Sequence, residues 1–494
     1  MMNSLRSKLS QHKWQTLLFV NLGTFMAPLD TGIVALVLPN IARDFQTGIG
    51  IAIWVPVIYL MILTAFMTSF GRFSDIKGRK KYFNIGLGIF ILGSAFSGMS
   101  GSIAELLIFR IVQAVGATLL LANSRALIVD AFPKSERGLA MGIHVTVIYI
   151  AIAAGPGLGA IITEYIGWRN VFFINIPLGL LVLPYSYSRL SESKKSSNTS
   201  MDWVGSLIFA VALSTLLIAL TFGPGENWTS IDAYIESIYL PLFSIFIWAR
   251  TYISIPILPL VGSSILLFIL LSVWEIKNKN PIIDLTMLKN NRIFLSSNLS
   301  ALLFYTSHFS TMTLLSFYLQ LIRLMDPTEA AFVLSAFPLS VVIASPFVGR
   351  LSDRIGSREL TSLGLLSVSI SLLLLSRLSP YSSIFFIDST LIIMGVGVAL
   401  FAAPNTNANL SSVGPDQRSL ANGMLGTMRH MGQGLSLALA AGIVGIFLSA
   451  DIYEVGGHIS VVEYVNGLSQ AFMIGSIIAM IGIVIVIFRG SNKN

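Results

Sequence analysis

The chain has 494 residues, of which 54% are hydrophobic and only 11% are charged, and it contains no cysteine. A soluble domain carries about 25% charged residues, so these charges cannot cover a water-exposed surface of this size, and the absence of cysteine excludes disulfides and thiolate metal sites. The net charge of +8 does not indicate a nucleic-acid partner, because the basic residues stand in short clusters between apolar runs rather than in one basic stripe.

The apolar segments predict a protein that crosses a membrane many times. A polar, basic segment at 1–13 precedes a long apolar run without a small-residue cleavage site, so we interpret this run as a retained first span. A spanning helix needs about 20 apolar residues. The expected spans are 15–38, 51–70, 82–101, 104–127, 139–163, 170–188, 203–222, 254–274, 293–322, 329–349, 360–379, 383–409, 419–449 and 467–488. Most Lys and Arg clusters then fall in loops on one side, which places both termini in the cytoplasm.

The connection at about 223–254 is unusually long and contains an apolar stretch at 235–248. This stretch is about 14 residues long, shorter than a spanning helix. A further span here would move the later basic loops to the outside, against the charge rule. We therefore interpret it as an interfacial or re-entrant part of an external hairpin.

Two pairs of loop sequences reveal an internal repeat. Segment 71–80 (GRFSDIKGRK) is similar to 349–358 (GRLSDRIGSR), and 137–142 (RGLAMG) is similar to 418–423 (RSLANG). The offsets of 278 and 281 residues nearly agree. The repeat predicts two six-helix bundles, which we divide as 1–189 and 293–494, joined by a linker at 190–292 with two extra transmembrane helices and the hairpin. Parallel repeats around a central path are typical of transporters with a substrate site near the midplane.

Several motifs resemble a known family. They are the loop at 71–81 and the segments 29–39 (LDTGIVALVLP), 110–116 (RIVQAVG), 154–160 (AGPGLGA) and 168–179 (WRNVFFINIPLG). Together they resemble the major facilitator superfamily and, within it, the fourteen-span drug:proton antiporter branch. Ala35 departs from the first-helix motif, where that branch usually has Asn.

The resemblance implies an all-α polytopic membrane protein with the major facilitator fold, built of two six-helix bundles and two additional helices. It further implies an antiporter that exports drugs or other small amphipathic or cationic molecules by alternating access. We expect no enzyme activity and no cofactor, with a proton gradient as the energy source, because the chain lacks a phosphate-binding loop ending in Lys-Ser or Lys-Thr and lacks a metal cluster. The expected location is the cytoplasmic membrane of a prokaryote, as a monomer.

Five polar residues are candidates for coupling protons to substrate. Asp30 lies half-way along the first span, where a charge costs about 2.5–3.5 kcal/mol, so it should face the bundle interior. We expect it to bind a proton or a cationic substrate; the alternative is a carboxylate hydrogen-bonded only for packing. The resemblance assigns proton coupling to Arg110, with Gln113 beside it, and the alternative is an ion pair that only locks helices together. Glu105 and His308 are further candidates, although a structural role is favoured for both: an ion pair that locks helices together for Glu105 and a hydrogen-bonded interhelical contact for His308.

The cytoplasmic loop at 71–81 is a candidate gate. Glycines there permit tight turns and close helix approach. Asp75 can accept hydrogen bonds from a helix start, which the resemblance places near Ser419, and Arg79 can pair with Asp130. Such contacts would hold the halves together on the cytoplasmic side; the alternative is plain orientation by positive charge. The gating candidates are Gly71, Asp75, Gly78, Arg79, Asp130 and, in the second half, Asp353.

Gly155, Pro156 and Gly159 in the fifth span resemble the exporter motif of the family. Proline removes an amide donor, and the glycines allow a neighbouring helix to approach closely. The alternative is an ordinary kink in a transmembrane helix.

Two other functions remain open. The chain could be a transporter dedicated to one metabolite, such as a sugar, siderophore or organic acid. A non-transporting membrane sensor or a membrane enzyme would need a sizeable soluble domain or a catalytic cluster, and the sequence has neither.

Overall fold

The computed structural model describes residues 2–133, 136–192, 202–222, 230–240, 245–278, 281–414, 417–447 and 460–489. The first half contains α1 (Met2–Asp44), α2 (Ile49–Ala52), α3 (Trp54–Lys77), α4 (Arg79–Met99), α5 (Ile103–Ala131), α6 (Arg137–Ile166), α7 (Asn170–Phe173) and α8 (Asn175–Arg189). Next come α9 (Trp203–Phe222), β1 (Ser230–Leu240), β2 (Ile245–Pro256), α10 (Ile257–Lys277) and α11 (Leu285–Asn290). The second half contains α12 (Arg292–His308), α13 (Thr311–Phe317), the π-helix η2 (Tyr318–Ile322), α14 (Pro327–Ile355), α15 (Ser357–Leu375), α16 (Ile384–Ser411), α17 (Arg418–Phe447) and α18 (Val461–Ile487).

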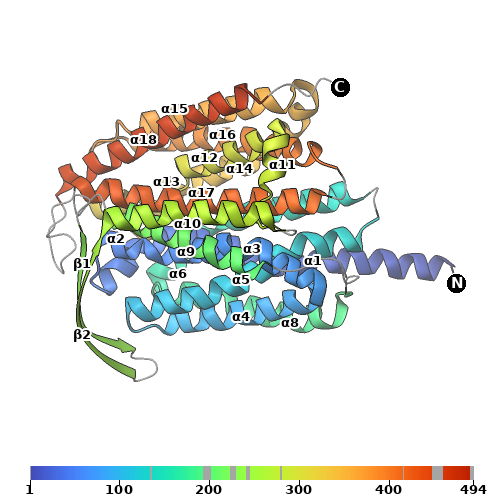
Figure 1. The fold of residues 1–494 in the computed structure, drawn as a ribbon, viewed down its shortest axis with the longest axis horizontal. Coiled ribbons are helices and arrows are strands. Elements are labelled where there is room, and N and C mark those ends of the chain that lie inside the picture. The colour runs from blue at the N-terminus through green and yellow to red at the C-terminus, as the bar shows by residue number, and fades with distance from the viewer. Residues whose placement is uncertain are drawn as a thin grey trace.

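The expected all-α polytopic fold is confirmed. Within the described residues, thirteen helices are long and apolar enough to cross a membrane. Helices suit lipid because they satisfy every backbone polar group internally. Figure 1 shows α1 beginning and α18 ending at the same end of the molecule, which we call the inner end because the basic loops lie there.

The ninth expected span, 293–322, is not among these thirteen, because it is interrupted. It consists of α12, α13 and η2, with a break at Phe309 and Ser310. The backbone N–H of Ser310 donates to the Ser436 hydroxyl of α17 at 2.9 Å. A side chain of the neighbouring helix thus satisfies a donor that a continuous helix would bond internally, so the chain can turn here inside the membrane.

The internal repeat is visible in the backbone. Gly78 joins α3 to α4 with φ of 116°, and its counterpart Gly356 joins α14 to α15 with φ of 96°. Residues with a Cβ rarely adopt this region, which explains glycine at both places. The second repeated segment begins a helix in each half, at Arg137 for α6 and at Arg418 for α17.

The two halves touch each other at both ends. At the inner end, Arg125 of α5 donates to the Asn422 side chain of α17 at 2.5 Å. At the outer end, Gln320 and Ser316 both donate to the backbone carbonyl of Leu36 in α1, each at 2.8 Å. Helix α9 packs on α3 and on α17, and α10 packs on α9, so the extra pair lies along the boundary between the halves (Figure 1).

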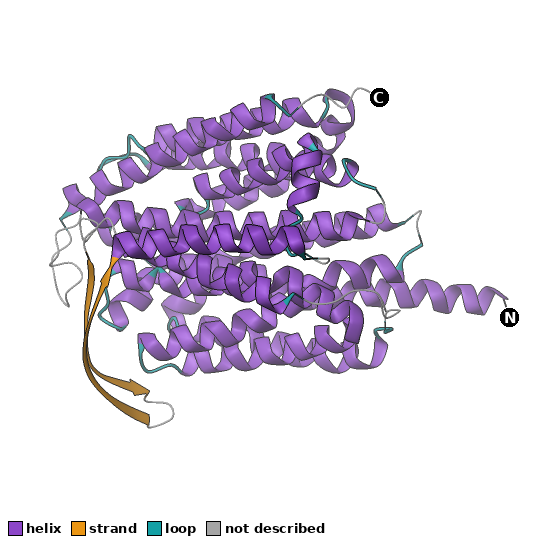
Figure 2. Ribbon diagram, in the orientation of Figure 1, coloured by secondary structure: helices purple, strands orange, loops and turns teal. Residues whose placement is uncertain are grey.

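The long connection at about 223–254 forms a β-hairpin. Strands β1 and β2 are antiparallel, with Tyr234 opposite Tyr252, and their register shifts between Ile235 and Ser237. Figure 2 shows the strands at the outer end, running across the helix ends of the first half. The apolar stretch at 235–248 therefore belongs to an external hairpin, as expected, and its described part is extended.

Candidate functional site

A buried ion pair joins α1 to α5. The Arg110 guanidinium donates to the Asp30 carboxylate at 2.5 Å, and the two side chains are 1% and 2% exposed. Gln113 donates to the other Asp30 oxygen at 2.9 Å and accepts from Arg110 at 2.6 Å. Three of the coupling candidates therefore form one hydrogen-bonded unit. A buried pair of this kind is costly to break, because a remaining partner is left as an uncompensated charge.

Aromatic and polar neighbours enclose this unit. The Tyr59 ring lies 4.4 Å from the Arg110 guanidinium, and the Arg110 Nε donates to the Val55 carbonyl at 3.3 Å. Gln113 also donates to Ser94 at 3.1 Å, and Asn175 donates to the same hydroxyl at 2.8 Å. The ion pair thereby connects α1, α3, α4, α5 and α8, so a change in its charge acts on five helices.

Glu105 lies five residues before Arg110 on the same helix. It lies at the start of α5, where its backbone N–H donates to Ser102 and its carboxylate accepts from the Gly101 N–H at 2.8 Å. This is a helix-capping arrangement. The structure thus favours the structural interpretation of Glu105 over a role in proton coupling.

A cavity of about 180 Å³ lies between the two halves. Both halves line it, through α1, α3, α5 and α6 on one side and α12, α13, α14, α16 and α17 on the other. Tyr59 borders it, whereas Asp30 is not among the lining residues. The Tyr59 ring therefore borders both the cavity and the buried ion pair. Ala35, the departure from the first-helix motif, also lines the cavity.

Cationic and imidazole side chains mark the cavity wall. Arg125 and Arg429 line it, and so do His144, His308 and His430. The five residues come from α5, α6, α12 and α17. His308 thus reaches the cavity as a coupling candidate should, although its Nδ1 lies 2.7 Å from the Phe304 carbonyl, the contact expected of a packing residue.

The inner loop holds the expected ion pair of Arg79 with Asp130 and a second pair of Arg79 with Asp75. Arg79 donates to Asp75 at 2.5 Å and to Asp130 at 2.8 Å, which ties α3 and α4 to the inner end of α5. The backbone N–H groups of Lys80 and Lys81 donate to the Glu192 carboxylate at 3.0 and 3.3 Å. This places an anion at the first turn of α4, where the helix dipole favours one.

Gly71 does not form a turn, because it lies inside α3, and a Cβ there would meet only the Ala122 Cβ at an ordinary 3.8 Å. The expectation of a tight turn at Gly71 was wrong: the helix runs on to Lys77 and ends at Gly78. The contact of Asp75 near Ser419 and the role of Asp353 concern side chains outside those described.

The exporter motif lies where α6 meets α1. A Cβ on Gly155 would stand 2.7 Å from the Gly32 Cα, and one on Gly159 would stand 3.1 Å from the Ile33 side chain. Helix α6 continues through Pro156, which lines the cavity. The glycines therefore permit a close helix contact, as expected, beside the central cavity.

The sequence interpretation missed three features of the site. It did not single out Tyr59, Arg429 or Glu192. The sequence could have identified Arg429, because an ionisable residue inside a predicted span indicates a functional site by default. Tyr59 and Glu192 carried no such signal, since tyrosines near membranes and acidic residues in loops are common.

Comparison with known proteins gives consistent matches over the whole chain. The family described as "Major Facilitator Superfamily" matches this chain over residues 20–321 and 293–494. The riboflavin transporter RibZ of Clostridioides difficile is 30% identical over 97% of this chain and 98% of its own length. The multidrug resistance protein Stp of Mycobacterium tuberculosis is 30% identical over 88% of this chain and 77% of its own length. A crystal structure of a bacterial homologue of the human lysosomal transporter Spinster covers 97% of both chains with a TM-score of 0.64 at 13% identity.

Proposed function

Because the chain belongs to the Major Facilitator Superfamily and resembles its multidrug exporters, we propose that it is a proton-coupled antiporter. It exports drugs or other small amphipathic molecules across the cytoplasmic membrane by alternating access. The observation that carries this proposal is the buried Asp30–Arg110 pair, which lies beside a cavity between the two halves. We retain 1–189 and 293–494 as the two moving bundles and 190–292 as the linker.

The ion pair supports coupling through simple electrostatics. A proton on Asp30 removes the negative charge, and Arg110 is then left as a buried, unpaired cation. The helices that meet at this pair must rearrange to solvate or re-pair that cation. Tyr59 conveys such a rearrangement to the cavity wall, because its ring borders both. Asp30, Arg110 and Gln113 are therefore the coupling residues in this proposal, with His308 as a cavity-lining candidate.

The test is uptake of fluorescent amphipathic dyes into inside-out membrane vesicles with an acidic interior. We expect the pH gradient to drive accumulation, because substrate enters as protons leave. One charge moving through 100 mV is worth about 2.3 kcal/mol, which sustains an accumulation of roughly fortyfold. A protonophore should abolish this accumulation. Uptake that persists unchanged with the protonophore would exclude proton coupling.

The Asp75, Arg79 and Asp130 cluster lies within the first half, and we propose that it stabilises the inner closure by holding the inner ends of α3 and α5 in place for α17, which packs on α3. Replacing Asp75 by Asn leaves Arg79 with Asp130 alone. Since a partly exposed ion pair contributes up to about 1 kcal/mol, the population opened towards the cytoplasm should rise by no more than about fivefold.

Labelling can measure this opening directly, because the chain has no native cysteine. A cysteine replacing Met67, on the cavity wall, should react up to about fivefold faster from the cytoplasmic side in Asp75→Asn than in the parent. Lys77→Gln is the control, since Lys77 is an exposed charge on the same helix. Equal labelling rates in Asp75→Asn, Lys77→Gln and the parent would remove the gate assignment.

A transporter dedicated to one metabolite is the second candidate. It is favoured by the relative RibZ, which matches nearly end to end and is named for riboflavin transport. Gradient-driven uptake of riboflavin, together with indifference to the dyes, would support this candidate over the first.

A further inference from the structure

Resting on the proposed transport function, we infer that the central cavity takes an amphipathic organic anion, with an oxyanion such as a carboxylate at one end and an apolar, ring-bearing body at the other. The basis is the unneutralised positive charge of Arg125 and Arg429. The sequence resemblance implies an amphipathic or cationic molecule, so the sign of the charge differs.

Neither arginine has a carboxylate partner among the described residues. Arg125 donates to the neutral Asn422 side chain. Arg429 lies over the Tyr305 ring at 5.3 Å, and its Nε is buried without a hydrogen-bond partner in the part of the chain that the structure describes. Both arginines line the same cavity, so two positive charges border one enclosed space.

Among the described residues, those that line the cavity include no Asp or Glu. Asp30 lies outside the lining and is already paired with Arg110. A cation that enters would therefore meet two like charges and no compensating carboxylate. In surroundings of low dielectric this repulsion is strong, whereas an anion neutralises charges that are otherwise uncompensated. Guanidinium groups also suit carboxylate, phosphate and sulfonate oxygens because they donate two parallel hydrogen bonds.

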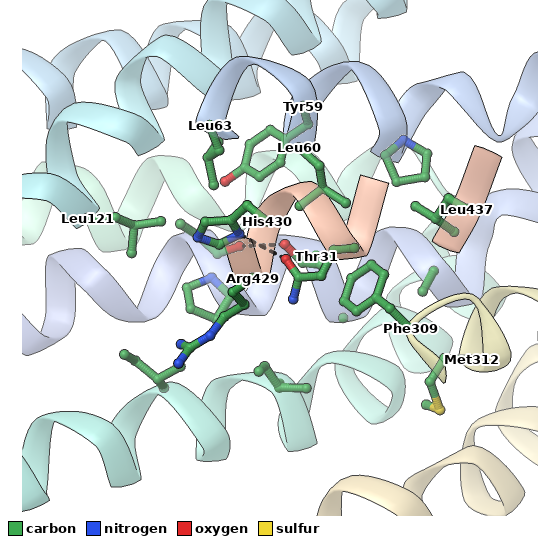
Figure 3. A pocket seen from close by; sticks show the side chains of 18 of the residues that line it. Thr31, Tyr59, Leu60, Leu63, Leu121, Phe309, Met312, Arg429, His430 and Leu437 are labelled. Atoms are coloured by element: carbon green, nitrogen blue, oxygen red, sulfur yellow. Dashed lines mark hydrogen bonds between the residues drawn. The ribbon is translucent and has the colours of Figure 1, made fainter. Parts of the chain in front are cut away.

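Most of the other lining residues are apolar, and the neutral polar ones include Thr311, Thr313 and Gln433. Figure 3 shows Arg429 on one side of the cavity and Phe309, Met312 and Leu437 on the other. Phe337 adds a second ring to the lining. Aromatic and thioether side chains pack adaptably against flat hydrocarbon groups. The ligand thus needs a charged end near Arg429 and an apolar body near Phe309.

A matched ligand pair tests the sign of the charge. 2-Naphthoate and 2-naphthylmethylammonium share one ring system and carry opposite charges. Their binding to the purified, detergent-solubilised protein is measured by equilibrium dialysis without any gradient, with empty micelles subtracted. We expect naphthoate to bind at least about tenfold more tightly than naphthylmethylammonium, because a hydrogen bond to a charged group strengthens binding by about tenfold or more.

Arginine variants locate the site. Arg429→Gln should weaken naphthoate binding by about 10- to 100-fold, and Arg429→Glu should reverse the preference between the two ligands. Lys289→Gln is the control, because it removes one positive charge from an exposed position on α11. Thermal unfolding of each variant shows whether it is folded, and the comparison of the two ligands on the unaltered protein does not depend on any variant.

The outcomes separate this inference from the function on which it rests. Tighter or equal binding of naphthylmethylammonium, or no binding of naphthoate, overturns the anion site, as does a folded Arg429→Gln protein with unchanged naphthoate affinity. Naphthoate that binds but is not accumulated by gradient-energised vesicles would leave the anion site standing and count against proton-driven export.

Discussion

Asp30→Asn should abolish gradient-driven accumulation, reducing the roughly fortyfold level available from one proton at 100 mV to equilibrium with the medium. The reason lies in the site geometry, because Asp30 is the buried carboxylate that pairs with Arg110 at 2.5 Å. Asparagine retains a hydrogen-bonding side chain but binds no proton at this position. The measurement is dye accumulation in inside-out vesicles, normalised to the amount of protein.

A second effect must be separated from the first. Asp30→Asn leaves Arg110 buried and unpaired, which costs about 3–5 kcal/mol of folding stability in comparable cases. The control is the double variant Asp30→Asn with Arg110→Gln, which removes both charges. We expect the double variant to regain thermal stability but not gradient-driven accumulation. If accumulation also returned, the pair would be purely structural, and the proposed coupling site would be wrong.

Gly155→Ala should destabilise the contact between α1 and α6. Its new Cβ would lie 2.7 to 2.9 Å from backbone atoms of Gly32 and Ile33, and backbone cannot rotate away as a side chain can. The helices must separate, and overpacking of this kind costs about 1–3 kcal/mol. Thermal unfolding of the purified protein measures the loss, and transport is expected to fall with it.

The same helix supplies graded controls. A Cβ at Gly157 would meet no atom within 4 Å, so Gly157→Ala should be nearly neutral. Gly159→Ala should fall between the two, because its Cβ would meet a flexible Ile33 methyl at 3.1 Å. The expected order of destabilisation is therefore Gly155, Gly159, Gly157. Equal unfolding temperatures for the Gly155 and Gly157 variants would show that close approach of these helices is not required.

The sequence predicted the fold well because membrane constraints act on short, local patterns. The lengths of the apolar segments located thirteen of the expected spans. The repeated segments lie at equivalent positions in the two halves, with Gly78 and Gly356 at corresponding turns. The interruption at Phe309 and Ser310 could not be predicted in this way. It depends on a hydroxyl from α17, which lies 126 residues further along the chain.

The candidate site was predicted in part. The sequence singled out Asp30, Arg110 and Gln113 separately, as polar residues at membrane depth. Their direct contact depends on how α1 packs against α5, which the sequence pattern does not show. The expected pairing of Arg79 with Asp130 was confirmed by the observed ion pair. The charge of the cavity could not be foreseen, because Arg125 and Arg429 lie about 300 residues apart and meet only when the two halves close around the centre.

The placement of the extra helices has a consequence for movement. Helix α9 is hydrogen-bonded to α3, through the hydroxyls of Ser206 and Ser69 and from Ser214 to the Met61 sulfur at 3.0 Å. Towards α17 it presents a methyl group of Leu217 at Gly434. Directional bonds hold their partners in register, whereas methyl contacts permit sliding. We therefore expect α9 and α10 to move with the first half as one rigid body. The second half then slides along the apolar surface of this helix pair.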